Sequence, residues 1–216
     1  MVSDSSSEED SDSDDSFGVK LHEYLREIGT YLRVTRAPRI LRRYFAMNAF
    51  DGAMTSLGVV IGAYITGISD PRAVIGVIIV SGIAMGISGF SGTYMTESAE
   101  RSKALDELEE AMLVDLDDTI YGQASRFVAV FAAIVDGSAP FLASLPSVMP
   151  FALGLLDIMS VELAFQLSMA ASLAILFLLG VFLGRVSRTN IVYSGIKMVV
   201  AGVIVAVLAL LLNGGH

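Results

Sequence analysis

Long apolar runs are the feature that most constrains how this chain can fold. A helix that crosses the hydrocarbon core of a bilayer needs about 20 mostly apolar residues, and five segments of the chain meet that requirement. The mean hydropathy of +0.66 is also too high for a soluble domain of 216 residues. The sequence therefore predicts an all-α membrane protein with five transmembrane helices, at about 44–67, 73–96, 127 to beyond 144, 163–184 and 191–213.

The third apolar run contains three prolines, Pro140, Pro146 and Pro150. Proline removes a backbone donor and clashes with the preceding turn, so it bends or breaks a helix. We therefore expect a bent or re-entrant piece at about 145–160.

Basic residues alternate between the two sides of the predicted bundle. One side has arginines and lysines before the first run, between the second and third, and between the fourth and fifth, whereas the other side has only Arg72. Short cytoplasmic loops are enriched in Lys and Arg, so we expect the N-terminus inside and the C-terminus outside. The residues of the basic side are Arg33, Arg36, Arg39, Arg42, Arg43, Arg101, Lys103, Arg126, Arg185, Arg188 and Lys197.

The segments that precede the spans differ in charge. Residues 1–16 hold seven acidic residues and no basic one, which predicts a disordered acidic tail. Residues 17–43 place apolar side chains at helical spacing and end in arginines, which is typical of an amphipathic helix on an anionic membrane surface. We expect Pro38 to end this helix before the five-span domain, 44–213. The chain has no cysteine, which excludes disulfides and thiolate metal sites.

Residues 97–122, between the second and third spans, are rich in helix formers and carboxylates. We expect a cytoplasmic acidic helix that extends the second span and turns back near Gly122. Glu100, Glu107 and Glu110 share one helical face, and carboxylates so spaced can gather a divalent ion, especially between facing helices. The alternative is a solvated acidic face that binds nothing.

The first apolar run contains a carboxylate, Asp51, in the stretch AFDGAMTSLG. An ionisable group inside a span is costly and normally faces protein or a water-filled path. Asn48 and Thr55 fall near the same helical face, so the helix has one polar stripe. Asp51 is therefore a candidate for ion transport. The alternative is a carboxylate held by an interhelical hydrogen bond.

The second apolar run has a stripe of its own, in which Ser81, Met85 and Ser88 follow heptad-like spacing. If this stripe faces Asp51, the thioether and the carboxylate offer one soft and one hard ligand. Such a pair suits a transition metal better than Mg²⁺ or Ca²⁺. The alternative is that Met85 fills a gap in the core.

Pairs of glycines four residues apart occur in three of the spans, a spacing that indicates close helix packing. They are Gly58 and Gly62, Gly82 and Gly86, and Gly180 and Gly184.

A second carboxylate, Asp136, lies in the third run, in AIVDGSAPF. Gly137 and Pro140 loosen the helix after it and free backbone carbonyls. Together with Asp51, a buried Asp136 suggests a path for a cation or a proton. Equally, Asp136 is compatible with a place in water at the outer end of a bent helix.

Four stretches of the chain, in order over about 44–213, resemble the vacuolar iron transporter family, which includes the yeast vacuolar calcium-cross-complementing transporter. The resemblance is to the first span, to the second span with its cytoplasmic continuation, to the proline-bearing third span, and to the last two spans with their basic loop. The stretches are AFDGAMTSLGVVIGAYITG, SGIAMGISGFSGTYMTESAER, DGSAPFLASLPSVMPF and LFLLGVFLGRVSRTNIVYSGIKMVVAGVIVA.

The resemblance implies a five-span homodimer that moves Fe²⁺ or Mn²⁺ out of the cytosol, by export or sequestration, in exchange for protons. It implies metal contacts at Asp51 and Met85, which match the family's pore-lining pair. Metal collection by the acidic helix is implied less directly, and its candidates are Glu97, Glu100, Glu107 and Glu110. We expect a non-enzymatic protein of an archaeal plasma membrane, without a permanent cofactor, whose partners are metal ions, protons, lipids and a second copy, and not nucleic acid.

The chain departs from the family pattern where relatives place an acid. Gly89 and Phe90 stand where many relatives have Glu-Tyr, and Asp136 stands where Gly is common, so Asp136 is a candidate for a relocated acid. Two other functions remain open. One is a non-transporting metal buffer or structural protein of the same fold. The other is an intramembrane aspartyl protease that uses Asp51 and Asp136, although no Gly-x-Gly precedes Asp136.

Overall fold

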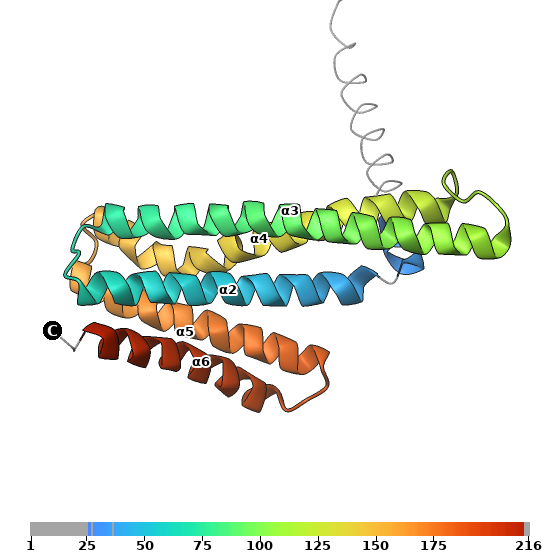
Figure 1. The fold of residues 1–216 in the computed structure, drawn as a ribbon. Coiled ribbons are helices and arrows are strands. Elements are labelled where there is room, and N and C mark those ends of the chain that lie inside the picture. Colours follow the sequence, from blue (N-terminus) through green and yellow to red (C-terminus); the bar gives the residue numbers. More distant parts are fainter. Residues whose placement is uncertain (1–25, 27, 36, 214–216) are drawn as a thin grey trace, which may run out of the picture. The chain divides into compact units, whose positions relative to one another are not determined.

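The described part of the chain is helical throughout. A computed structural model describes residues 26, 28–35 and 37–213 (Figure 1), and no strand occurs among them. The five long helices are α2 (Ala37–Ile65), α3 (Pro71–Met112), α4 (Ile120–Leu155), α5 (Val161–Val186) and α6 (Ile191–Asn213). Each is long and apolar enough to cross a bilayer. The prediction of an all-α fold with five apolar helices is confirmed, and by length and composition the chain is a multi-pass membrane protein.

The start of the first span differs from the expectation. Pro38 does not end a preceding helix but lies in the first turn of α2, which begins at Ala37. A helix tolerates proline there because the first backbone N–H groups have no intrahelical partner. Residues 28–34 are helical and end in a turn at Thr35. The rest of the predicted amphipathic helix, 17–25, and the acidic tail lie outside the described residues.

The re-entrant piece expected at 145–160 is wrong, because α4 continues through its prolines to Leu155. A membrane helix tolerates proline where neighbouring helices and hydroxyl side chains satisfy the freed backbone groups. Two hydroxyl groups bond the backbone in this part of α4: Ser168 on α5 donates to the Ser147 carbonyl at 2.6 Å, and Ser144 donates to the Phe141 carbonyl at 2.7 Å. The carbonyls that Pro140, Pro146 and Pro150 leave without an intrahelical donor are different ones, four residues before each proline. The chain then turns, and the Ser160 side chain caps α5.

The described helices fall into two units, and the larger consists of residues 41–96 and 131–213. Its core combines alanines on α2 and α4 with larger aliphatic residues on α2 and α5. Small side chains let membrane helices approach closely, which favours van der Waals contact where lipid gives no hydrophobic drive. The buried members of this cluster are Ala49, Ala53, Leu57, Ile61, Ala139, Ala143, Leu176 and Leu179.

Two of the three predicted glycine pairs mark close helix contacts within the chain. A Cβ at Gly180 would lie 2.5 Å from the carbonyl oxygen of Ser194, and one at Gly184 would lie 2.9 Å from the Ser194 side chain, so α5 and α6 need these glycines to pack. Gly86 marks a similar approach of α3 to α4. The third pair is different, because nothing lies within 4 Å of a Cβ built at Gly58 or Gly62.

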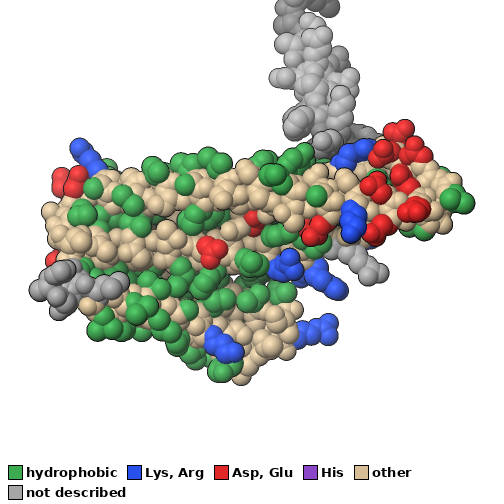
Figure 2. Space-filling view, in the orientation of Figure 1, with side chains coloured by type: hydrophobic (Ala, Val, Ile, Leu, Met, Phe, Trp, Pro, Cys, Tyr) green, Lys and Arg blue, Asp and Glu red, His purple; other side chains and the backbone are tan. Residues whose placement is uncertain are grey.

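The smaller unit consists of the described residues before Leu41 together with Glu97–Val130, where α3 ends, the chain reverses, and α4 begins. The ring of Tyr31 packs on Phe127 with their centroids 5.6 Å apart. In the α3–α4 turn, the Leu116 amide donates to the Glu109 carboxylate at 2.7 Å, which caps the reversal. Acidic side chains gather around this turn (Figure 2).

Candidate functional site

One face of α2 combines a carboxylate with small residues and is open in the single chain. Asp51, Thr55, Gly58 and Gly62 follow one another at intervals of four, three and four residues, so they share this face. Asp51 is exposed, and it forms no hydrogen bond or ion pair with the described residues. Together with the space over both glycines, this leaves a charged, lightly covered face in the middle of an apolar helix.

The side chain of Met85 on α3 approaches this face. The Thr55 hydroxyl lies 3.6 Å from the Met85 sulfur, within the range of a weak hydrogen bond to a thioether. Thr55 lies one turn after Asp51 on the same face of α2. The structure thus places the predicted thioether against Thr55, the residue one turn after the predicted carboxylate on α2.

Asp136 is buried, with 2% of its surface exposed, so its alternative place in water at an outer helix end is wrong. Its Oδ1 accepts a hydrogen bond from the amide of Asn48 on α2. Its Oδ2 accepts one from the hydroxyl of Thr93 on α3, over 2.6 Å. A Cβ at Gly89 would lie 3.2 Å from Oδ2 and 3.3 Å from the Asn48 amide nitrogen, so this glycine leaves room for the cluster. We call these three side chains the Asp136 cluster.

Asp51 and Asp136 are near each other but separately arranged. Their charges are close enough to interact, yet no hydrogen bond joins the two carboxyl groups, and the oxygens of Asp136 accept instead from Asn48 and Thr93. Asn48 lies three residues before Asp51 on α2, so the same helix carries the exposed acid and a partner of the buried one.

Sequence reasoning missed Thr93. The residues of α3 that meet α4 are Gly82, Gly86, Gly89 and Thr93, whereas the predicted stripe of Ser81, Met85 and Ser88 is displaced by about one position. Ser81 is half-buried and Ser88 is exposed. Small residues at intervals of four, three and four that end in a threonine were the available signal.

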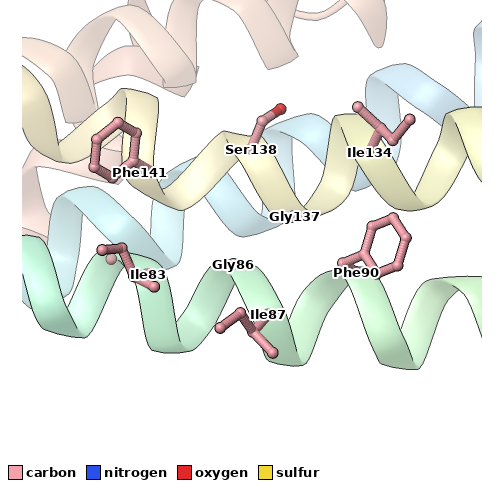
Figure 3. A pocket seen from close by; sticks show the side chains of 9 residues that line it. Ile83, Gly86, Ile87, Phe90, Ile134, Gly137, Ser138 and Phe141 are labelled. Carbon is pink, nitrogen blue, oxygen red and sulfur yellow. The ribbon is translucent and has the colours of Figure 1, made fainter.

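The close contact of α3 and α4 borders a shallow apolar groove (Figure 3). A Cβ at Gly86 would lie 2.6 Å from the Gly137 carbonyl oxygen, so the two backbones nearly touch here. Asp136 directly precedes Gly137, and the contact therefore helps to enclose the carboxylate. The groove is lined by Gly82, Ile83, Gly86, Ile87, Phe90, Ile134, Gly137, Ser138 and Phe141.

The four predicted glutamates of the acidic helix lie on the part of α3 within the smaller unit and differ in their surroundings. Glu97 is 4% exposed and pairs with Arg101 at 3.0 Å. Glu107 is exposed and lies 3.8 Å from Lys103. Glu100 and Glu110 are exposed. In the described part of one chain, no group of three or more His, Cys, Asp or Glu residues is arranged to hold a metal ion.

Comparison with known proteins relates the chain to an archaeal protein. The chain is 32% identical over 175 residues to the uncharacterized protein MJ0645 of Methanocaldococcus jannaschii, and the alignment covers 79% of this chain and 87% of that protein. No family model matches the chain. No solved structure matches it.

Proposed function

This chain belongs to the same family as the Methanocaldococcus jannaschii protein MJ0645, and we propose that it transports divalent transition-metal ions, Fe²⁺ or Mn²⁺, out of the cytosol in exchange for protons. Asp51 and Met85 contact the metal in the membrane. The ion is the substrate, and the protein needs no permanent cofactor.

The exposed carboxylate of Asp51 is the observation that carries this proposal. An acid inside a span is costly and normally faces protein or water. Within the single chain Asp51 is not covered by protein, since it is exposed on an apolar helix. In the proposed transporter, a bound cation supplies the opposite charge and a second copy of the chain supplies the protein cover that this carboxylate lacks. Met85 adds a soft ligand about one turn away, which favours a transition metal over Mg²⁺ or Ca²⁺.

The proposed transporter is a homodimer with α2 at its two-fold axis. One chain gathers too few ligands for a divalent ion, because no cluster of three acidic or histidine side chains exists among its described residues. A two-fold axis beside α2 doubles both Asp51 and Met85. The open glycines Gly58 and Gly62 have the four-residue spacing with which membrane helices pack closely, so they suit a contact with the second copy.

The proposed orientation has the N-terminus in the cytosol and the C-terminus outside, in an archaeal plasma membrane. Arg101, Lys103 and Arg126 flank the α3–α4 turn, and Arg185 and Arg188 flank the α5–α6 turn. Because alternate connections between the spans carry these charges, the positive-inside rule places those connections in the cytosol. The acidic part of α3 then faces the cytosol, where its exposed glutamates attract metal ions.

A protease function is less well supported by the arrangement of the two aspartates. An aspartyl dyad shares a proton between two carboxyl groups in contact. Here the oxygens of Asp136 are bonded to Asn48 and Thr93, and Asp51 is exposed on another face.

The test is metal uptake by liposomes that contain the purified protein. We expect Fe²⁺ and Mn²⁺ to enter with or without an imposed pH gradient, and to enter faster when the gradient favours exchange. Co²⁺ is a third probe of metal preference, and Ca²⁺ is the negative control. Binding of Fe²⁺ without any flux would instead support a membrane metal buffer.

A further inference from the structure

The metal path leaves the buried carboxylate of Asp136 unexplained. Asp136 is 2% exposed, and both of its oxygens accept hydrogen bonds from uncharged groups. In the described helices no lysine, arginine or histidine forms an ion pair with it. The protein therefore does not neutralise this carboxylate with a fixed cation, and either a proton or a mobile ion must balance its charge in the membrane.

The hydrogen bonds around Asp136 serve both of its protonation states. The Thr93 hydroxyl has one proton and two lone pairs, and it donates to Oδ2 when Asp136 is ionised. When Oδ2 carries a proton, the Thr93 hydroxyl oxygen accepts a hydrogen bond from it. The hydroxyl then donates its own hydrogen to the Gly89 carbonyl one turn back, a bond that helical threonines commonly make. The amide of Asn48 donates to Oδ1 in both states. One rotation of the Thr93 hydroxyl thus lets Asp136 gain or lose a proton without leaving a buried polar atom without a hydrogen-bond partner.

From this geometry we infer that Asp136 carries the exchanged proton, and that Asn48 and Thr93 position the Asp136 carboxyl group. The proton carrier is thus a different residue from the metal contact, Asp51. This assignment rests on the proposed metal–proton exchange.

The position of Asn48 links the carrier to the metal contact. Asn48 binds Asp136 and lies three residues before Asp51, so a shift of α2 around a metal ion at Asp51 also moves the amide that holds Asp136. The two carboxylates also interact through their charges. A divalent cation at Asp51 stabilises an ionised Asp136 and expels its proton, and the return of a proton to Asp136 favours release of the metal.

Few other ionisable groups surround the cluster. Asp51 is the charged group that α2 brings near it. Residues 73–96 of α3, 163–184 of α5 and the remainder of 127–155 in α4 contain no acidic or basic residue. The one tyrosine of these three segments is Tyr94, whose ring stacks on Phe90. On α6, the ammonium of Lys197 lies 4.5 Å from the Tyr193 ring. One turn after Thr93 on α3, Glu97 is buried but pairs with Arg101. Asp51 and Asp136 are therefore the carboxylates of the larger unit near the cluster.

The test measures protons and metal together in liposomes that contain the full chain. One dye inside the vesicles reports Mn²⁺ and another reports pH, so each variant yields a ratio of protons moved per metal ion. We expect Asp136→Asn to lose the metal-driven proton movement and the pH dependence of Mn²⁺ uptake, and Asp136→Glu to keep both. Thr93→Val should weaken the coupling, whereas Thr93→Ser, which keeps the hydroxyl, should restore it. A purely structural role would change both fluxes equally and leave their ratio unaltered.

Infrared difference spectra of the wild type cover the case in which Asp136→Asn does not fold. Addition of Mn²⁺ should remove the C=O stretch of a protonated carboxyl group, and this band should shift in Thr93→Val. Absence of the band in a wild type that exchanges metal for protons overturns the assignment. So does a folded Asp136→Asn that keeps the wild-type ratio. A wild type that moves no metal overturns the proposed function and this assignment together.

Discussion

The Thr55 hydroxyl on α2 lies 3.6 Å from the Met85 sulfur on α3. This contact brings a thioether to the polar face of α2, about one turn from the exposed carboxylate of Asp51. A carboxylate and a thioether on adjacent helices form the part of the membrane domain with the chemistry to recognise a soft divalent cation. The first two predictions separate their contributions.

Asp51→Asn keeps the shape of the side chain and removes its charge. We expect a protein that inserts, dimerises and is at least as resistant to heat as the wild type, because a costly charge has left the span. Its Fe²⁺ flux should fall at least about tenfold, equivalent to about 1.4 kcal/mol in a barrier. The measurement is liposome flux beside wild type at matched protein density. A mutant with the wild-type flux would show that Asp51 has only a structural role.

Met85→Leu conserves volume and apolar character but removes the sulfur. We expect a loss of Fe²⁺ flux smaller than about tenfold, which is less than 1.4 kcal/mol in a barrier. Mn²⁺ should be affected less than Fe²⁺ or Co²⁺, because the thioether matters most for softer ions. The check is the ratio of Fe²⁺ to Mn²⁺ uptake in the same vesicles. An unchanged ratio would place Met85 in the packing and not in the metal path.

Single cysteines test the proposed dimer contact, since the chain has no native cysteine. Gly58→Cys and Gly62→Cys lie on the open face of α2 and should cross-link between two copies under mild oxidation. Ala49 is 1% exposed and packs in the core, so Ala49→Cys is the matched control and should remain monomeric on a denaturing gel. Equal cross-linking at all three positions, or at none, contradicts an α2 interface in a folded protein.

The exposed glutamates of α3 test whether the acidic helix collects metal. The test variant loses three charges through the combined substitutions Glu100→Gln, Glu107→Gln and Glu110→Gln. Glu97 is left unchanged because it is buried and paired with Arg101. We expect the half-saturating metal concentration to rise at least about twofold, because a weaker local field gathers fewer cations. The maximal flux should remain, since the membrane path is unaltered. Unchanged flux at low metal concentration would indicate a solvated face without a role in transport.

Two glycines of α3 offer a matched test of the α3–α4 contact. A Cβ at Gly86 would lie 2.6 Å from the Gly137 carbonyl oxygen, whereas a Cβ at Gly92 meets nothing within 4 Å. We expect Gly86→Ala to destabilise the protein by about 1–3 kcal/mol through overpacking. Gly92→Ala should be neutral or stabilising by up to about 1 kcal/mol, the gain in helix propensity. Thermal unfolding in detergent checks both, and equal midpoints would contradict the close approach of the two helices.

The sequence by itself determined the elements that depend on chain-local physics. Five long, mostly apolar runs are sufficient to predict five long helices, because a backbone in lipid must satisfy its hydrogen bonds within each segment. Asp51 stood out for the same reason, since a charge in such a run is costly wherever the helix packs. By contrast, the effect of Pro146 and Pro150 on α4 was not local. Helix α4 continues to Leu155 in contact with its neighbours, as in the bond from the Ser168 hydroxyl of α5 to the Ser147 carbonyl.

Tertiary structure alone decided which side chains meet. A shift of one position on α3, a rotation of about 100°, turns Gly89 and Thr93 toward α4 and leaves Ser88 exposed. Small residues occur on both faces of α3, so helical periodicity did not show which of them meets α4. Whether Asp136 met water or protein likewise depended on Asn48 and Thr93, which lie 88 and 43 residues away in the chain. The identity of a buried acid can therefore be read from its own segment, but its partners come from helices whose relative rotation is set by close packing at glycines such as Gly86 and Gly137.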